Sequence, residues 1–129
     1  MGDIETRADI DALLRVFYAR AFDDELLRHI FIEVAHMDLE EHLPMIGNFW
    51  EKVLLGTVEY SGNAMRLHRH LHDREPLTPA HFQQWLTIWN QTIDARHQGT
   101  TADRAKRDAA RIALAMQRNL YRAAGPTQL

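Results

Sequence analysis

The chain has 129 residues, a formal charge of −3 and no cysteine, and 46% of its residues are hydrophobic. Its length predicts a single domain over residues 1–129, and its slight acidity disfavours a nucleic-acid binder, which usually carries a basic excess. No apolar run approaches the length of about 20 residues that a helix needs to cross a bilayer. The absence of cysteine excludes disulfides and thiolate metal sites. It also fits a reducing, cytoplasmic compartment.

The first part of the chain predicts an amphipathic helix followed by a short helical segment. Apolar residues recur at helical spacing at Ile10, Leu13, Leu14, Phe17, Ala21 and Phe22. This is the period of a helix with one buried face, and Thr6 and Asp9 have capping-box spacing at its start. Asp23 and Asp24 interrupt the pattern, and residues 25–31 predict a short turn of helix.

The next segment predicts a helix between Asp38, a residue suited to an N-cap, and Gly56, a natural C-cap. Pro44 lies inside it, and a proline beyond the first turn removes a backbone hydrogen bond. We therefore expect the regular helix either to start near Glu41 or to have a distorted first turn.

The stretch SGNAMRLHRHLHDR predicts a shorter helix with Ser61 or Asn63 near its N-cap. Its apolar stripe comprises Ala64, Met65, His68, Leu71 and His72. A histidine thus lies in the middle of a face that is otherwise expected to be buried.

Two long helices complete the chain. Thr78-Pro79 is a strong start signal for the first, which should end at Gly99, and Thr101 starts the second, which should stop at Gly125-Pro126. The residues expected to point inward are Phe82, Trp85, Leu86, Trp89 and Ile93 in the first helix, and Ala102, Ala105, Ala109, Ile112, Ala113, Met116 and Leu120 in the second. The sequence therefore predicts an all-α fold of about five to seven helices. The mixture of long and short helices suggests that they surround something besides each other.

Eight histidines are an unusual number for this length, and His68 is the most informative. A single histidine on an apolar stripe is commonly a hydrogen-bonded core residue, but neutral imidazole is also the commonest metal ligand and the usual proximal ligand of haem. His68 and His72 have the spacing of the two zincin histidines. Arg69 occupies the position where a zincin has glutamate, and no third ligand is evident nearby. Arg66, Arg69 and Arg74 form either a solvated basic face or a site for a carboxylate of a bound cofactor.

Three further helices each place one polar side chain on or beside an apolar stripe, namely Tyr18, His42 and Trp85. Singly, each is most simply a core residue whose polar end has an ordinary partner. Together with His68 they would bring four polar groups from four helices into an interior without acidic partners. We interpret this set as the lining of an apolar cavity for a ligand that accepts hydrogen bonds.

Several stretches resemble the truncated haemoglobins, and best the third group of that family. They are Phe17-Tyr18, Phe31, HLPMIGNFWEKVLLG from His42 to Gly56, YSGNAMRLH ending at His68, and HFQQWL ending at Leu86. The Gly-Gly pairs that mark the other two groups are absent. The resemblance runs from about Ile10 to Met116 and implies a bacterial protein with a two-over-two helical sandwich around haem b.

Position by position, the resemblance implies that His68 is the proximal histidine that binds the haem iron. Tyr18, His42 and Trp85 match the distal polar residues near a bound ligand. The matches that line the haem pocket are Phe31, Ile46, Phe49 and Trp50. The stretch from His68 to Trp85 is a few residues longer than the resemblance leads us to expect, so His72 remains an alternative proximal ligand.

The function implied by the resemblance is binding of dioxygen, nitric oxide, carbon monoxide or peroxide at a histidine-ligated iron. Each distal donor would add about 1.5–3 kcal/mol to an oxygen complex, which corresponds to about 10–150-fold slower release. We therefore expect high-affinity binding linked to oxygen or nitric-oxide redox chemistry or sensing, not bulk transport. The alternative is a haem enzyme of peroxidase or nitric-oxide dioxygenase type, with His42 as acid–base. Turnover would need an external reductase. A cofactor-free helical interaction module is a third reading.

Overall fold

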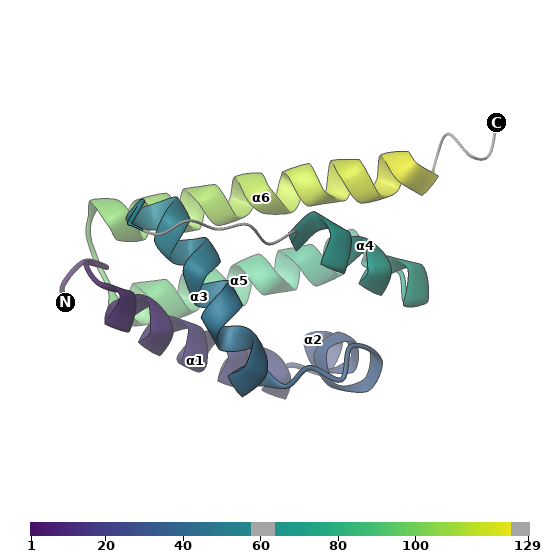
Figure 1. Ribbon diagram of the computed structural model, residues 1–129, viewed down its shortest axis with the longest axis horizontal. Helices are drawn as coiled ribbons and strands as arrows, with labels where there is room; N and C mark the ends of the chain where they lie inside the picture. Colours follow the sequence, from purple (N-terminus) through teal and green to yellow (C-terminus); the bar gives the residue numbers. More distant parts are fainter. Residues whose placement is uncertain (58–63, 125–129) are drawn as a thin grey trace.

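The structure is a computed structural model and describes residues 1–57 and 64–124. Six α-helices and one short π-helix account for most of these residues. In chain order they are α1 (Arg7–Asp23), α2 (Glu25–Arg28), the π-helix η1 (His29–Val34), α3 (Leu39–Leu54), α4 (Ala64–Arg74), α5 (Pro79–Arg96) and α6 (Thr100–Ala124) (Figure 1). These residues contain no β-strand, so the all-α prediction is confirmed. None of the helices combines the length and apolarity that a membrane span requires.

The first helices start at the capping signals in the sequence. Thr6 caps α1, and its capping box with Asp9 is formed in both directions. The Asp38 side chain accepts a hydrogen bond from the Glu41 N–H at the start of α3, and Thr78 caps α5. Because these side chains satisfy N–H groups that have no partner within the helix, they fix where each helix begins.

Helix α6 begins at Thr100, one residue before the predicted start. Its first turn is held from the other end of the chain, because the Asp3 carboxylate accepts hydrogen bonds from the backbone N–H groups of Thr101 (2.9 Å) and Ala102 (2.8 Å). The remaining predicted signals, Ser61 or Asn63 before α4 and Gly125-Pro126 after α6, lie outside the described residues.

The expectation that Pro44 would delay or distort the start of α3 is wrong, because α3 runs through Pro44 without a break. Arg7 of α1 secures this part of α3: Nη2 donates to the Pro44 carbonyl (3.2 Å) and Nη1 to Glu51 (2.9 Å). Gly47 leaves space for the guanidinium, since a Cβ at that position would lie 2.5 Å from Arg7 Nη2. The α1–α3 contact therefore stabilises a turn that the proline weakens.

The short helix predicted over residues 25–31 is longer and of two kinds. Helix α2 ends at Arg28 and continues as η1, in which the backbone N–H of Ala35 donates to the Ile30 carbonyl at 2.9 Å. A π-helix has one more residue per hydrogen-bonded turn than an α-helix. The extra residue shifts the register of the side chains, so a pattern search at the α-helical period underestimates this segment.

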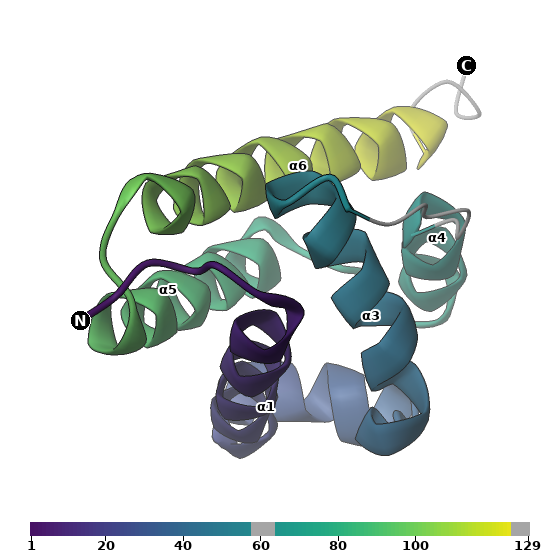
Figure 2. The same cartoon turned by 60° about the vertical axis from the view of Figure 1, so that its left-hand side comes forward.

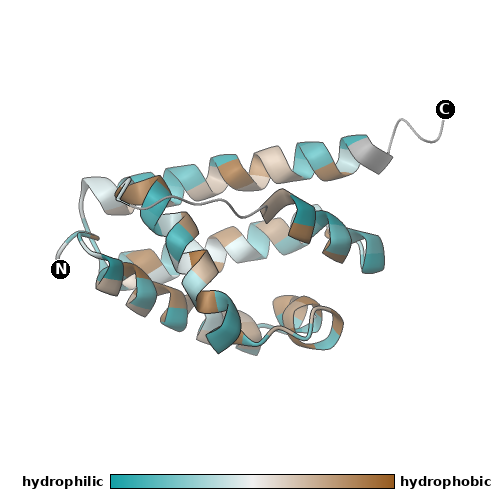
Figure 3. Cartoon of the chain, in the orientation of Figure 1, coloured by the Kyte–Doolittle hydropathy of each residue, from teal (hydrophilic) through white to brown (hydrophobic). Residues whose placement is uncertain are grey.

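The helices pack as two pairs, α1 with α3 and α5 with α6, and α1 also packs on α5 (Figures 1 and 2). The core lies where these helices meet, and Figure 3 shows that apolar residues alternate with polar ones along each helix. The largest fully buried side chains include Trp89, Phe17, Ile10, Leu13, Leu14 and Ile93. All of them belong to the predicted inward faces of α1 and α5.

Some residues predicted to point inward are only half-buried: Trp85, Leu86, Ile112 and Met116. Three of them, Trp85, Ile112 and Met116, border a cavity. Their partial exposure is therefore an exposure to an internal space and not an error in the helical face.

Candidate functional site

A cavity of about 410 Å³ lies between the helices, with lining residues from α1, α2, η1, α3, α4, α5 and α6. This volume falls within the range of small-molecule and cofactor sites, about 300–1,000 Å³. All eight residues that the sequence analysis proposed for the site line the cavity: Tyr18, Phe31, His42, Ile46, Phe49, Trp50, His68 and Trp85. The structure thus brings the whole predicted set together.

The His68 imidazole is arranged like a metal ligand. Its Nδ1 lies 2.7 Å from the backbone carbonyl of Ala64, and because a carbonyl only accepts, Nδ1 must carry the ring proton. Burial lowers the pKa of His68, against the opposing effect of the Ala64 hydrogen bond. The ring is therefore neutral at pH 7, with a free lone pair on Nε2, and metal-binding histidines usually have this tautomer and this kind of carbonyl contact.

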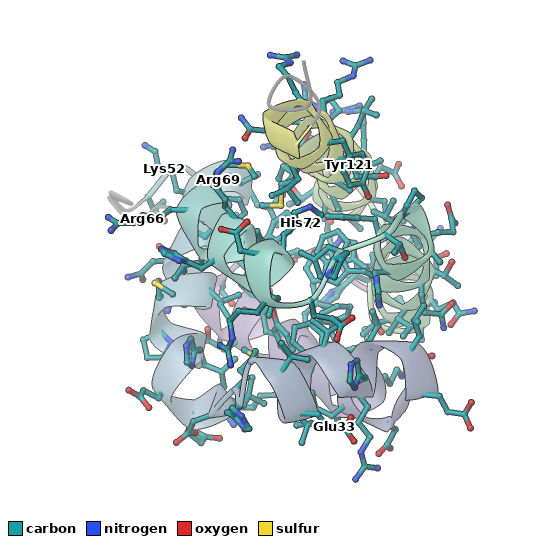
Figure 4. All side chains as sticks on the ribbon, turned by 90° about the vertical axis from the view of Figure 1, so that its right-hand side faces the viewer. Glu33, Lys52, Arg66, Arg69, His72 and Tyr121 are labelled. Atoms are coloured by element: carbon teal, nitrogen blue, oxygen red, sulfur yellow. The ribbon has the colours of Figure 1, made fainter. Side chains whose placement is uncertain are left out.

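His72, the alternative proximal ligand, is engaged elsewhere. Its Nδ1 accepts a hydrogen bond from the backbone N–H of Leu77 at 2.9 Å. Its ring lies 6.0 Å from the ring of Tyr121, where α4 faces α6 (Figure 4). His72 does not line the cavity. Among the described residues, no group of three or more histidine and acidic side chains is arranged to hold a metal ion, so the zinc alternative has no support there.

Two hydrogen-bond donors on residues that line the cavity have no protein partner in the described part of the chain. They are the hydroxyl of Tyr18 and the indole N–H of Trp85. Burial raises the pKa of Tyr18, so its hydroxyl keeps its proton over the whole physiological range. Packing holds both rings: Tyr18 makes an edge contact with Phe31 at 5.7 Å, and Trp85 stacks on Trp89 at 5.9 Å with an interplanar angle of 4°.

His42 differs from these donors because its Nδ1 lies 2.8 Å from the Asp38 carbonyl. This bond again places the ring proton on Nδ1. In the neutral ring, Nε2 is then a hydrogen-bond acceptor or a base. His42 therefore supplies a different function to the cavity from the one that Tyr18 and Trp85 supply.

Sequence reasoning missed several residues at the cavity, among them Leu67, His70 and His81. The sequence does contain a signal for Leu67, because it is an apolar residue among the charged residues of α4. In the structure its side chain is 51% exposed. Of the three α4 arginines considered for a cofactor carboxylate, only Arg74 lines the cavity, and Arg69 instead donates to Asn119 of α6. Of the predicted stripe of α4, Ala64, His68 and Leu71 line the cavity. Leu67 lies beside them at the cavity, whereas Met65 packs with the cluster that includes Leu120.

No side chain of helix α4 is fully buried, although His68 is partly so. An isolated helix of its length, 11 residues, is only marginally stable in water. A flat apolar molecule between α4 and the rest of the protein would cover Leu67, and Arg74 is placed to pair with an acidic edge of such a molecule. A porphyrin with carboxylate side chains and an iron that needs a neutral imidazole fits this set of residues.

Comparison with known proteins agrees with this fit. The family description "Bacterial-like globin" matches residues 2–118 of the chain. The chain is 29% identical over 119 residues to the group 3 truncated haemoglobin Ctb of Campylobacter jejuni, an alignment that covers 90% of this chain and 91% of the relative.

The fold is also similar to a solved structure. The crystal structure of the group III truncated haemoglobin from Campylobacter jejuni superposes with a TM-score of 0.82 at 27% identity, covering 97% of this chain and 99% of that one. The two-over-two arrangement expected from the sequence is therefore confirmed. The chain belongs to the bacterial-like globins, the family of the truncated haemoglobins, whose members are haem proteins that bind diatomic ligands.

Proposed function

We propose that residues 1–129 form one globin domain in which His68 binds the iron of haem b. We further propose that the domain binds dioxygen and related small ligands with high affinity, for redox chemistry or sensing. The observation that carries the proposal is the cavity itself, which combines a neutral imidazole with two unpartnered donors. Haem, when bound, supplies an iron centre with one coordination position for His68 and one for a diatomic ligand.

Several side chains would hold the cofactor. The apolar residues Phe31, Ile46, Phe49 and Trp50 would pack against the ring, and the ordered contacts among their aromatic groups limit their motion. Leu67 of α4 would be covered by the opposite face of the haem ring. Arg74 and His70 are the basic residues of α4 at the cavity, and they would pair with the carboxylates.

Tyr18 and Trp85 would determine how long a ligand is retained. A diatomic ligand that carries partial negative charge is stabilised by fixed donors, each contributing about 1.5–3 kcal/mol when the acceptor is charged. Because both rings are held by aromatic neighbours, little ordering is needed when the ligand arrives. Two such donors favour slow release, which suits a reactive or sensing site more than a carrier.

A haem enzyme of peroxidase or nitric-oxide dioxygenase type is the second candidate. His42 favours it, because Nε2 of the neutral ring can accept a proton from a ligand such as hydrogen peroxide. The partner of His68 weighs against strong peroxidase activity: the Ala64 carbonyl is a weaker acceptor than the carboxylate that would make the imidazole more anionic. Either activity would draw electrons from a reductase that is still to be identified.

The proposal is tested by the rate of oxygen release after reconstitution with haem. We expect slow release, accelerated about 10–150-fold by either Tyr18→Phe or Trp85→Phe. Tyr121→Phe is the matched control, because the Tyr121 hydroxyl donates to the Leu77 carbonyl at 2.8 Å and does not line the cavity. Fast release that none of the three substitutions changes would contradict the proposal.

A further inference from the structure

The outward face of α6 carries a line of arginines with one leucine among them. Its members are Arg107, Arg111, Leu114, Arg118 and Arg122, all exposed. Their spacings of four and three residues place them on one side of the helix. We call this set the α6 arginine stripe, and at about 1.5 Å per residue it extends for about 22 Å.

The stripe is poorly neutralised, although the chain as a whole carries a charge of −3. Arg111 pairs with Asp108 at 2.5 Å. Arg107, Arg118 and Arg122 make no ion pair with any of the residues that the structure describes. The sequence from 109 to 129 contains no Asp or Glu. Positive charge is therefore concentrated along this face, against the overall sign of the protein.

Helix α4 extends the same basic face. The guanidinium of Arg69 donates to Asn119, which is adjacent to Arg118 in α6. Figure 4 shows Arg69 on the side of α4 toward α6, whereas Arg66 lies farther from α6, near Lys52. The positive surface thus spans two helices.

The position of the stripe relates it to the cavity. The opposite face of α6 lines the cavity with Ile112, Ala113 and Met116. A protein bound to the stripe would therefore be separated from the cavity by the thickness of one helix, about 10–12 Å. Helix α6 itself lies at an outer edge of the molecule, on the side away from α2 (Figures 1 and 2).

We propose that the α6 arginine stripe is the docking surface for an acidic one-electron carrier protein that reduces the haem iron. This inference rests on the proposed function, because only a haem site would need such a supply. In the step, the carrier loses one electron and ferric iron gains it, so no bond is made or broken and no proton has to move. In this proposal the electron comes from a separate protein.

The chemistry of the stripe favours a protein partner. Arginine is enriched at protein interfaces, and Leu114, which is 49% exposed, supplies an apolar centre within a charged rim. Binding of single-stranded nucleic acid usually adds aromatic side chains for base stacking. Tyr121, the aromatic residue nearest the stripe, instead donates inward to Leu77. One leucine is also too little apolar surface to insert into a lipid bilayer.

The experiment uses the haem-reconstituted protein and a reduced flavodoxin, an acidic flavoprotein, as the probe. Anaerobic mixing under carbon monoxide reports each reduction as formation of the carbon monoxide spectrum. We expect the second-order rate to fall as salt is added. The double variant Arg118→Glu/Arg122→Glu should lower the rate at low ionic strength by about 10-fold or more. Arg28→Glu, at an exposed position of α2 away from the stripe, is a single charge-reversal control and should have little effect.

A second readout does not depend on haem. Nuclear magnetic resonance titration of the protein with oxidised flavodoxin should shift backbone amides of α6 and α4, and the shifts should vanish in the double variant. If haem fails to bind, the proposed function fails, while this titration still decides whether the stripe docks an acidic protein. Equal rates for the double variant and Arg28→Glu would overturn the inference. Competition at the stripe by duplex DNA or anionic vesicles with the affinity of flavodoxin would overturn it as well.

Discussion

The two sides of the cavity are built in different ways. On one side, α1 and α5 meet in an aromatic core in which Phe17 and Trp89 are each 1% exposed. The indole N–H of Trp89 donates a hydrogen bond to the Ala105 carbonyl there. On the side formed by α4, no side chain is fully buried, and Leu67 is 51% exposed. The difference indicates that protein packing completes the side formed by α1 and α5, whereas α4 has less packing of its own.

Because of this asymmetry, we expect the aromatic core to determine the stability of the fold and α4 to respond to ligand binding. The aromatic core fixes Tyr18 and Trp85 before any ligand arrives, because their rings already contact Phe17 and Trp89. Helix α4 carries His68 but contributes little buried surface of its own. Binding of the cofactor would therefore order α4 and stabilise the folded protein at the same time.

The largest expected effect on stability is in the core. Trp89→Ala should lower the free energy of unfolding by about 3–5 kcal/mol, because it removes a fully buried ring and leaves a cavity. Leu67→Ala in the protein without haem should cost less than about 0.5 kcal/mol, as is usual for an exposed site. Urea unfolding of both variants measures the contrast, and similar losses would show that the two sides do not differ.

A smaller effect is expected in the mobility of α4. Before haem is added, backbone amides of α4 should exchange with deuterium faster than those of α5. Haem at 100 times its dissociation constant stabilises the bound form by about 2.7 kcal/mol, so exchange in α4 should slow by about 100-fold. His68→Ala should abolish most of this slowing. Slow exchange of α4 in the protein without haem would contradict the comparison.

The smallest effect concerns a contact next to α4. His29 of η1 lies between two carboxylates, with Nδ1 at 2.5 Å from Glu33 and Nε2 at 3.1 Å from Glu75, which directly follows α4. The hydrogen bond to Glu33, followed by that to Glu75, raises the pKa of His29 above its usual value. Because the folded pKa is the higher one, the stabilisation is complete below about pH 6.5 and is lost as pH rises through the raised value.

This pH dependence can be measured by urea unfolding from pH 6 to pH 9. The difference in stability between the unsubstituted protein and His29→Gln should be greatest at pH 6 and should decrease toward pH 9. The control is His36→Asn, which changes an exposed histidine at a backbone φ of 51° that asparagine tolerates. A difference that is the same at every pH would show that His29 does not act through its charge.

The parts of the fold that sequence analysis predicted correctly are those that local rules determine. Capping at Thr6, Asp38 and Thr78 follows from side-chain hydrogen bonds within one turn, and the structure has each of them. The polar site residues could be found because each interrupts an apolar stripe. His68 and Tyr18 are examples, and both line the cavity.

The features that sequence analysis missed depend on distant parts of the chain or on empty space. Continuity of α3 at Pro44 depends on Arg7, 37 positions away in the sequence. The place of Leu67 at the cavity could not be predicted from the apolar residues of α4, because a side chain that borders a cavity is exposed like one on the surface. The π-helix η1 departs from the 3.6-residue period on which the analysis relied.

Visible absorption of the ferrous protein after haemin addition, with and without carbon monoxide, tests the role of His68 most directly. The unsubstituted protein and His72→Ala should give the same histidine-ligated spectra, because His72 bonds to Leu77 away from the cavity. His68→Ala should lose these spectra and regain them when free imidazole is added. Unchanged spectra in His68→Ala, or their loss in His72→Ala alone, would contradict the assignment of the iron ligand.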